Sequence, residues 1–326
     1  GVIDISGASK YEVKGPDAGK FLDRLSCNRL PASDGRMALS LFHLPNGGIM
    51  SDMSITRLAE DHYYLFSAIG SEHKDLHWMK MNQSGFDVTI ENVTDDITGF
   101  LLTGPASRDI LQRMTDEDIS DNAFPWLRAR TMQIDSAQAR VMRVSYAGEL
   151  GYEVHMPRYQ LLSIYDSMQR VGAGYGLRDF GGYAFNSLRL EKAYRSYGNE
   201  FTEEISALES GMSRFVDLSR DFIGRDSLAE RQEKGFEIEL AYLVFDDDVP
   251  CECYGNEAVF AGKEYIGLTT SGAYGFRIGR SLAFAYLRRE TIAEGLQVTV
   301  HTSVGQRQAH IEIAMAFDPK NERLRS

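Results

Sequence analysis

The spacing of apolar residues predicts the same local unit twice in the first half of the chain. Residues 11–25 read as an apolar strand, a Gly-Pro turn at Gly15 and a helix with apolar positions three and four residues apart. Residues 100–114 repeat this order around Gly104. Two unrelated α+β units are the alternative, since strand, turn and helix often follow one another. The matching Gly-Pro pairs favour an internal duplication.

The segments that follow these helices also correspond. In the first copy two strands flank a glycine turn at Gly47, and in the second copy two strands flank a turn between Gly148 and Gly151. A helix closes each copy. The expected strands are Met37–Leu44, Met53–Leu58, Ala139–Tyr146 and Tyr152–Met156, and the expected helices are Ser71–Gln83 and Arg158–Gly172. We therefore expect duplicated, ferredoxin-like α/β halves.

The pattern changes near residue 236. Before this point we expect a helix over Phe180–Glu191, a strand over Gly211–Leu218 and a polar helix after Phe222–Leu228. Beyond it, short strands are separated by Gly, Asn or Asp, which predicts a small antiparallel β-barrel. The expected strands are Glu237–Phe245, Ala258–Phe260, Glu264–Thr269, Ser281–Tyr286, Gln297–His301 and Gln306–Ile313. The fold class is therefore α+β, with one domain over residues 1–235 and a barrel domain over 236–326.

Composition removes several classes of function. Hydrophobic residues make up 43% and charged residues 25% of the 326 positions, so the whole chain can belong to packed domains. The net charge of −12 argues against a protein that binds duplex nucleic acid. Apolar stretches such as Ser281–Leu287 are far shorter than the ~20 residues of a membrane-spanning helix. We expect neither a nucleic-acid nor a membrane partner.

The cysteines predict a reducing compartment. Cys27, Cys251 and Cys253 are an odd number of thiols without a C-x-x-C pair, so we expect a cytoplasmic or mitochondrial-matrix protein. Cys251 and Cys253 have no matching cluster of ligands nearby, which favours two incidental thiols over a metal or redox site. The chain begins Gly-Val-Ile without Met or a signal-like segment, as expected of a processed product or a piece of a longer polypeptide.

Two carboxylates are the candidate reactive groups. Asp52 and Glu153 each lie just beyond a glycine turn, and apolar neighbours surround both. A single carboxylate is more often a solvated surface group. Buried carboxylates need partners, and function commonly depends on their shifted pKa values. If the halves pack about a pseudo-two-fold axis, Asp52 and Glu153 are expected to face one cavity.

The order of the motifs resembles the aminomethyltransferases of the glycine cleavage system and their relatives fused to amine dehydrogenases. The resemblance covers almost the whole chain. Each motif alone is weak, whereas their common order is strong. The segments that carry it are Gly1–Ser6, Asn46–Asp52, Arg143–Glu153, Ser187–Glu191, Tyr197–Asn199 and Phe222–Arg225.

Departures from the family pattern indicate a branch. Phe185 stands where glycine-cleavage enzymes usually have Arg, and residues 270–282 replace a segment that contains Pro. Residues 174–183 are closer to the dehydrogenase-linked form. The iron–sulfur-repair branch has a Lys-Gly-Cys-Tyr-type motif where this chain has Tyr197-Gly-Asn, without cysteine. The chain therefore looks most similar to the folate domain of dimethylglycine and sarcosine dehydrogenases.

The resemblance implies that tetrahydrofolate binds in a central hole. It assigns catalysis to Asp52 and assigns Glu153 to the donor-rich edge of the pterin, which suits a carboxylate that accepts two hydrogen bonds in parallel. Tyr146 is expected near the ring and Ser54 near Asp52. Without the resemblance, Tyr146 would be interpreted as a packed strand aromatic. The remaining residues assigned to folate binding are Ser67, Arg189 and Tyr197.

The implied reaction is transfer of a methylene group from a small N-methylated amine, or its iminium, to give 5,10-methylenetetrahydrofolate. No G-x-G-x-x-G follows an opening strand, so FAD is expected only in a separate amine dehydrogenase domain or subunit. One alternative is a folate-dependent methyltransferase or demethylase, or a glycine-cleavage aminomethyltransferase. A second is a folate-binding module without turnover. The presence of Asp52 favours an enzyme.

Overall fold

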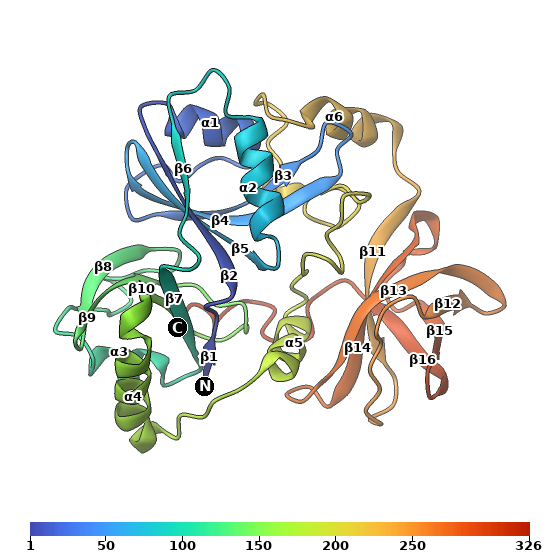
Figure 1. Cartoon of the computed structure of the whole chain (residues 1–326). Helices are drawn as coiled ribbons and strands as arrows, with labels where there is room; N and C mark the ends of the chain where they lie inside the picture. Colours follow the sequence, from blue (N-terminus) through green and yellow to red (C-terminus); the bar gives the residue numbers. More distant parts are fainter. The chain divides into compact units, whose positions relative to one another are not determined.

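The computed structural model describes all residues, 1–326, as two compact units (Figure 1). The first unit comprises residues 1–42, 51–181 and 322–326, and the second comprises residues 43–50 and 182–321. The first unit holds two five-stranded sheets, and the second holds a closed barrel. No helix is long and apolar enough to cross a membrane.

The first sheet has the strand order β3-β4-β5-β2-β6, and helices α1 and α2 cover one of its faces. Helix α1 buries Phe21, Leu22 and Leu25, the apolar spacing that predicted it. Gly15 before this helix has φ +133°, and a Cβ there would lie 2.4 Å from the Asp87 carbonyl oxygen, so the turn requires glycine. The elements are β2 Ala8–Lys14, α1 Ala18–Leu25, β3 Met37–His43, β4 Ile49–Ala59, β5 His62–Ile69, α2 Glu72–Met81 and β6 Thr89–Asn92.

The second sheet has the order β1-β7-β10-β9-β8, and its core lies between the sheet and helices α3 and α4 (Figure 1). Tyr152 and Val154 of β10 enter this core with Ile110, Leu111 and Ile164 of the helices. The elements are β1 Val2–Asp4, β7 Ile97–Thr103, α3 Ser107–Gln112, β8 Ala129–Ile134, β9 Ala137–Met142, β10 Gly151–Pro157, a 3-10 turn Arg158–Gln160, α4 Leu161–Gly172 and a 3-10 turn Ala173–Tyr175.

The two sheets repeat the same strand order, which confirms the expected pair of halves. Strands β3, β4, β5, β2 and β6 correspond in turn to β8, β9, β10, β7 and β1. Arg36 and Arg128 form an antiparallel bridge. The two flanking backbone hydrogen bonds, Met37 N to Leu127 O and Ala129 N to Gly35 O, are equivalent when the two halves are exchanged. Equivalent positions therefore meet at this bridge, as a pseudo-two-fold axis requires.

The predicted equivalence of Asp52 and Glu153 is wrong. Asp52 lies on β4, which corresponds to β9, whereas Glu153 lies on β10, which corresponds to β5. Glu12 and Leu101 are equivalent, because each stands three residues before the glycine of its Gly-Pro turn. Glu12 pairs with Tyr64 and Leu101 pairs with Glu153 on the neighbouring strands, so Tyr64 is the counterpart of Glu153. The sequence comparison aligned glycine turns that follow different strands of the repeat.

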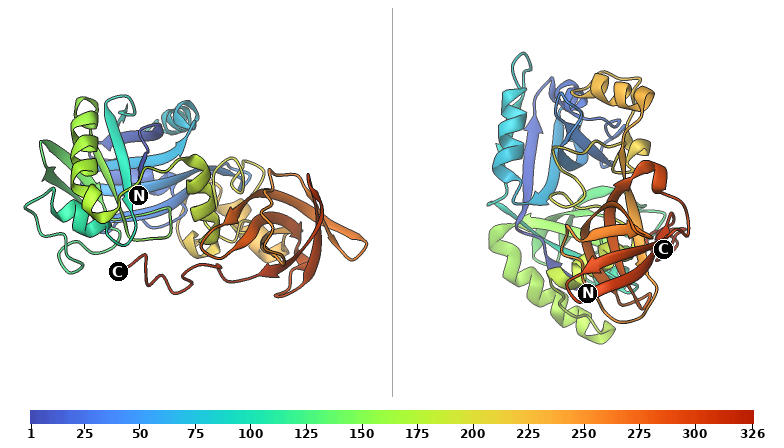
Figure 2. Two further views of the ribbon diagram at one scale, coloured as in Figure 1. Left: turned by 90° about the horizontal axis from the view of Figure 1, so that it is seen from below. Right: turned by 90° about the vertical axis from the view of Figure 1, so that its right-hand side faces the viewer.

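The second unit carries helices α5 and α6 and the closed antiparallel barrel β11-β14-β13-β12-β15-β16 (Figure 2). The expected barrel is thus confirmed, and its first strand begins at Ile238. The compact unit that holds it also includes residues 43–50 and 182–235, which the sequence interpretation placed in the first domain. The elements are α5 Gly182–Glu191, α6 Arg225–Lys234, β11 Ile238–Phe245, β12 Ala258–Ala261, β13 Glu264–Gly275, β14 Arg280–Arg288, a 3-10 turn Arg289–Thr291, β15 Gln297–Thr302 and β16 Gly305–Glu312.

One expected strand of this unit is absent. Residues 211–218 contain a 3-10 turn, Ser213–Phe215, in place of a strand. Gly211 has φ +70°, and the amide of Phe215 donates to the Met212 carbonyl oxygen, so the backbone turns here. Cys27, Cys251 and Cys253 are buried free thiols, and no group of His, Cys, Asp or Glu is arranged to hold a metal.

The last residues of the chain are anchored in the first unit by a buried arginine. Arg143 is 1% exposed, and its Nη2 donates to the carbonyl oxygens of Arg325 and Ser326 at 3.0 Å each. Its Nη1 donates to the carbonyl oxygen of Phe124 at 2.9 Å. Leu324 is also buried. The C-terminal segment is therefore an integral part of this unit.

Candidate functional site

Asp52 and Glu153 lie on the faces that the two sheets of the first unit turn toward each other. The aromatic rings of Phe66 on β5 and His155 on β10 lie 5.1 Å apart between centroids. Thr56 Oγ1 lies 3.9 Å from Met142 Sδ across the same interface. Residues two or four positions apart in a strand point to the same face of the sheet. Asp52 therefore shares a face with Thr56 on β4, and Glu153 shares a face with His155 on β10.

Asp52 has an enclosed carboxyl group with an unsatisfied oxygen. Its Oδ1 is buried without a hydrogen-bond partner, although the residue as a whole is only partly buried. Burial raises the pKa of Asp52 to about 6, and the negative charge of Asp75 adds to this rise. Lys74 acts in the opposite direction. A carboxyl group that titrates near neutrality can serve as a general base at physiological pH.

Ser67 lies on the other face of the first sheet, beneath helix α2. Its Oγ donates to Asp75 Oδ2 at 2.6 Å, and Asp75 is 1% exposed. Tyr11, which shares this face, likewise donates its hydroxyl to the Glu72 carbonyl oxygen in α2. Ser67 thus holds Asp75, the carboxyl group whose charge acts on Asp52. The folate contact expected of Ser67 stays a prediction.

Glu153 is surrounded by buried polar side chains. It is 8% exposed, and its Oε2 lies 3.5 Å from Nε2 of His155. This distance is at the outer limit of hydrogen bonding, and Nε2 has no hydrogen-bond partner in the structure. Burial lowers the pKa of His155, although the Glu153 carboxylate opposes this effect, so the imidazole is neutral at physiological pH.

Lys10 places a buried ammonium group in the same region. Its Nζ donates to the carbonyl oxygens of Ser6 and Ala8, at 2.8 and 2.7 Å, and lies 5.8 Å from the centroid of the Phe66 ring. Burial lowers the pKa of Lys10 to about 8, against the attraction of nearby carboxylates that include Glu153.

Tyr146 lies on the loop between β9 and β10, and this loop is closely packed. A Cβ at Gly151 would lie 2.7 Å from Cβ of Ser145, so glycine allows the loop to fold back on the strand. Thr103 Oγ1 lies 3.2 Å from Ser145 Oγ and donates to the Leu150 carbonyl oxygen. Tyr146 is partly buried. Ser54 lies two residues after Asp52, on the same face of β4, and its expected part in folate binding stays a prediction.

Arg189 in the second unit is committed to structural contacts. Its guanidinium donates to Asn186 Oδ1, the Tyr194 carbonyl oxygen, Glu200 Oε2 and Ser271 Oγ at 2.8–3.0 Å. These four bonds leave one of its five N–H donors. The folate contact expected for Arg189 stays a prediction.

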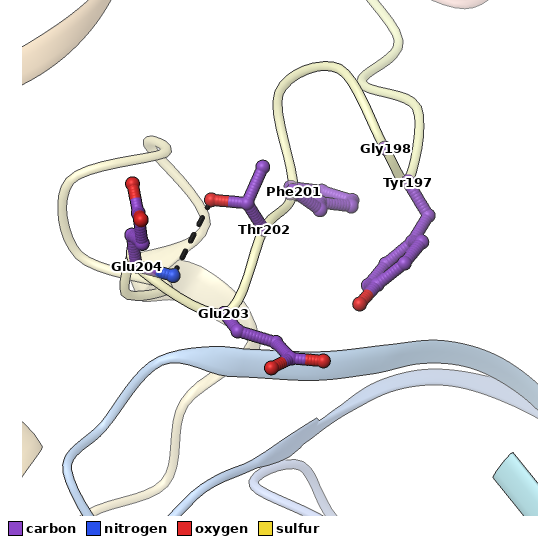
Figure 3. Close-up of a pocket in the computed structure, with 6 residues that line it drawn as sticks. All are labelled: Tyr197, Gly198, Phe201, Thr202, Glu203 and Glu204. Carbon is purple, nitrogen blue, oxygen red and sulfur yellow. Dashed lines mark hydrogen bonds between the residues drawn. The ribbon is translucent and has the colours of Figure 1, made fainter. Parts of the chain in front are cut away.

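Tyr197 lines a pocket of about 420 Å³ in the second unit. In Figure 3, the Tyr197 ring and the carboxyl group of Glu203 point toward the same space, on one side of the segment 197–204. The amide of Glu204 donates to Thr202 Oγ1 at 3.4 Å and closes the turn. The remaining lining residues are Gly198 and Phe201.

The sequence interpretation missed three residues of the first unit: Lys10, Asp75 and His155. His155 follows Glu153 by two positions, so strand alternation alone could have placed it on the same face. Asp75 and Lys10 gave no such signal, because charged residues are usually solvated. Only the packing of α2 on β5, and of the two sheets on each other, shows that both are buried.

The titration of Asp52 should respond in opposite directions to its two charged neighbours. Asp75→Asn removes a negative charge and is expected to lower the Asp52 pKa from about 6, whereas Lys74→Gln removes a positive charge and is expected to raise it. ¹³C NMR of the labelled carboxyl carbon measures both. Because the pKa of Asp52 is higher in the folded state, its protonated form favours folding. This contribution to stability is fully present below pH ~4 and is lost as the pH rises through 6. A titration near pH 4 in the wild type would contradict the burial argument.

Two family profiles match the chain. "GCVT N-terminal domain" matches residues 1–220, and "Glycine cleavage T-protein C-terminal barrel domain" matches residues 239–318. An aminomethyltransferase of Thermoanaerobacter sp. (strain X514) is 31% identical over 303 residues, which are 92% of this chain and 81% of that protein. The glycine cleavage system aminomethyltransferase T of Bartonella henselae, a solved structure, shares the fold with a TM-score of 0.87 at 21% identity, covering 98% of this chain and 86% of that one.

A further relative is a longer protein. The mitochondrial dimethylglycine dehydrogenase of Mus musculus is 37% identical over 305 residues, which are 92% of this chain. The chain spans about a third of the length of that protein, 35%.

Proposed function

Because the chain belongs to the glycine-cleavage T-protein family of folate-dependent aminomethyltransferases, we propose that it transfers a one-carbon unit from a small amine to tetrahydrofolate. The observation that carries this proposal is the pair of carboxylates on the facing sheets. Asp52 has a raised pKa and an unsatisfied oxygen, and Glu153 lies beside a buried ammonium and a neutral imidazole. Binding and proton transfer are thereby assigned to different residues.

The residues present fit a reduced pterin. Such a ring offers adjacent N–H donors, and Glu153, a nearly buried carboxylate, can accept two of them in parallel. The buried Oδ1 of Asp52 lacks a donor from the protein, as expected of a group that acts on a ligand. Ser54 and Tyr146 are proposed to complete this part of the site, and Ser67, Arg189 and Tyr197 remain proposed folate contacts.

The proposed chemistry assigns one role to each carboxylate. Tetrahydrofolate supplies the weakly basic nitrogen that accepts the one-carbon unit. The folate nitrogen bonds to the donor carbon, and the bond from that carbon to the donor amine breaks, so that the amine leaves. Asp52 withdraws the proton from the folate nitrogen, or stabilises the positive charge that develops there. Glu153 keeps the acceptor fixed, so that proximity to the donor supplies much of the rate. A single carboxylate with a pKa near 6 is ionised above this pH and can receive the proton.

The identity of the donor is a finer proposal with two candidates. The aminomethyltransferase of Thermoanaerobacter sp. (strain X514), of which this chain covers 81%, supports an aminomethyl donor of the glycine-cleavage type. The 37% identity to dimethylglycine dehydrogenase supports a methylated amine or its iminium, oxidised by an FAD-dependent partner domain or subunit. The comparisons support the aminomethyl donor at least as well. Assays that supply each donor separately, with methylenetetrahydrofolate as the measured product, distinguish the two.

We expect tetrahydrofolate to bind at one site with micromolar-range affinity, about −8 kcal/mol. Glu153→Ala should weaken binding about 10- to 100-fold, because the ring donors lose their charged acceptor. Isothermal titration calorimetry measures both values. A matched control is Glu149→Ala, which removes a carboxylate from the neighbouring loop and should leave affinity unchanged. Equal affinity in wild type and Glu153→Ala would refute the assignment of the folate site.

A folate-binding module without turnover is the competing class. It shares the binding behaviour but predicts no product from either donor. Product formation above the spontaneous reaction between tetrahydrofolate and formaldehyde excludes it. If no donor gives product while tetrahydrofolate binds, the non-catalytic interpretation replaces the transferase.

A further inference from the structure

A chain of buried polar side chains links Glu153 to the opposite sheet. Tyr64 of β5 places its hydroxyl oxygen 2.7 Å from Nδ1 of His155 on β10. The Nε2 of the same imidazole is buried without a hydrogen-bond partner and lies 3.5 Å from Glu153 Oε2. Tyr64 is fully buried and His155 is 1% exposed. The imidazole of His155 thus lies between the Tyr64 hydroxyl and the Glu153 carboxylate.

The acceptor chemistry of Glu153 fixes the tautomer of His155. An ionised carboxylate only accepts hydrogen bonds, so the nitrogen that faces it must carry the proton. A neutral imidazole has one N–H, and Nδ1 is then the acceptor for the Tyr64 hydroxyl. Burial raises the pKa of Tyr64, which therefore stays protonated and can donate. The Tyr64 hydroxyl proton thus points toward His155, and the His155 Nε2 proton points toward Glu153.

Close packing holds the imidazole in this orientation. A Cβ at Gly99 would lie 2.8 Å from Cδ2 of His155, so the glycine on β7 makes room for the ring on one side. The Phe66 ring lies 5.1 Å away, with an interplanar angle of 49°. At the Tyr64 end of this series of side chains, the guanidinium of Arg140 lies 4.0 Å from the centroid of the Tyr64 ring. Arg140 also donates to Glu12 at 3.1 Å, which holds the guanidinium in place.

We propose that His155, oriented by Tyr64, is a positioning residue that directs the carboxylate of Glu153 toward the donor edge of its ligand. This inference rests on the proposed function of Glu153 as the pterin acceptor. A glutamate side chain has a broad distribution about its terminal torsion. An N–H group 3.5 Å from Oε2 attracts that oxygen and favours the orientation in which lone pairs of both oxygens point away from His155. Affinity then depends on a preorganised carboxylate as well as on its charge.

The test compares two conservative substitutions of His155. The amide nitrogen of Gln extends to about the place of Nε2, whereas that of Asn reaches only the place of Nδ1. We expect His155→Asn and His155→Leu to weaken tetrahydrofolate binding about tenfold, and His155→Gln to restore most of the affinity. Tyr64→Phe should give an intermediate loss. Calorimetry measures the affinities, and Val154→Ala, which faces the helices from the same strand, controls for lost core packing.

NMR gives a readout that a merely structural role would not change. ¹⁵N chemical shifts of the imidazole should show the neutral form protonated at Nε2 in the wild type. Tyr64→Phe should lose the Nδ1 acceptor shift, and Glu153→Ala should allow the other tautomer. A wild-type imidazole protonated at Nδ1 overturns the proposal.

The affinities separate this inference from the proposed function. If Glu153→Ala weakens binding while every His155 variant binds like wild type, the positioning role is wrong and the folate site stands. If Val154→Ala weakens binding as much as His155→Leu does, His155 acts through packing alone and the proposal also fails. If Glu153→Ala binds like wild type, the proposed function itself is wrong.

Discussion

Replacing Asp52 with asparagine is expected to slow one-carbon transfer by about 10²–10⁴-fold and to leave tetrahydrofolate affinity nearly unchanged. Asparagine keeps the size of the side chain but cannot receive a proton or stabilise a cation. The binding group, Glu153, lies on the other sheet and is untouched. The assay supplies a one-carbon donor and tetrahydrofolate, and follows methylenetetrahydrofolate against free formaldehyde. With a methylated-amine donor, the variant should release formaldehyde while amine oxidation continues.

The control for this substitution is Asp75→Asn. Asp75 is buried near Asp52 but lies on the helix-covered face of the sheet, where Ser67 holds it. At pH 8, above the pKa of Asp52, the control should transfer the one-carbon unit at close to the wild-type rate. At pH 5 it should exceed the wild type, because its Asp52 is ionised to a greater extent. Equal rates for Asp52→Asn and wild type would show that Asp52 is not catalytic.

The largest expected loss of stability follows Arg189→Met. Arg189 and Glu200 form an ion pair at 3.0 Å, and both side chains are at most 2% exposed. Removing the arginine leaves Glu200 as an uncompensated buried charge, which typically costs about 3–5 kcal/mol. Chemical denaturation, followed by circular dichroism, measures the free energy of unfolding.

The double variant Arg189→Met/Glu200→Gln is the internal control. Its loss should be smaller than the sum of the two single losses, because the neutral amide no longer needs a positive partner. Thr270 and Ser271 both donate to Glu200, and either can still bond to the amide oxygen. A purely additive result, combined with a specific loss of folate affinity in Arg189→Met, would favour a ligand contact over a structural role.

Much of the fold could be predicted because local signals agreed with the tertiary structure. The glycine of each Gly-Pro pair has positive φ, +133° at Gly15 and +118° at Gly104, and each precedes a helix. The Gly-Pro pair and the apolar spacing of the helix that follows it are both local signals. The barrel strands were predictable for the same reason, since Gly, Asn or Asp separates alternating segments.

The errors arose where distant contacts decide the structure. The sequence aligned Asp52 with Glu153 through similar glycine turns, but the strand order makes Tyr64 the counterpart of Glu153. Residues 211–218 alternate like a strand, yet no neighbouring strand pairs with them. Asp52 and Glu153 lie on the faces that the two sheets turn toward each other, and this placement depends on how the sheets pack.

The C-terminal segment held by Arg143 also determines how the chain can be divided. The polypeptide leaves the first unit after residue 42, returns at 51, leaves again after 181 and returns at 322. A cut after Gly181 would therefore give two fragments, each with part of its partner's unit. The first fragment would hold Ile49, whose amide bonds to residues of the second, and the second would hold the tail that Arg143 binds. Such fragments would each need a segment of the other to complete its unit, so neither half is a self-contained domain.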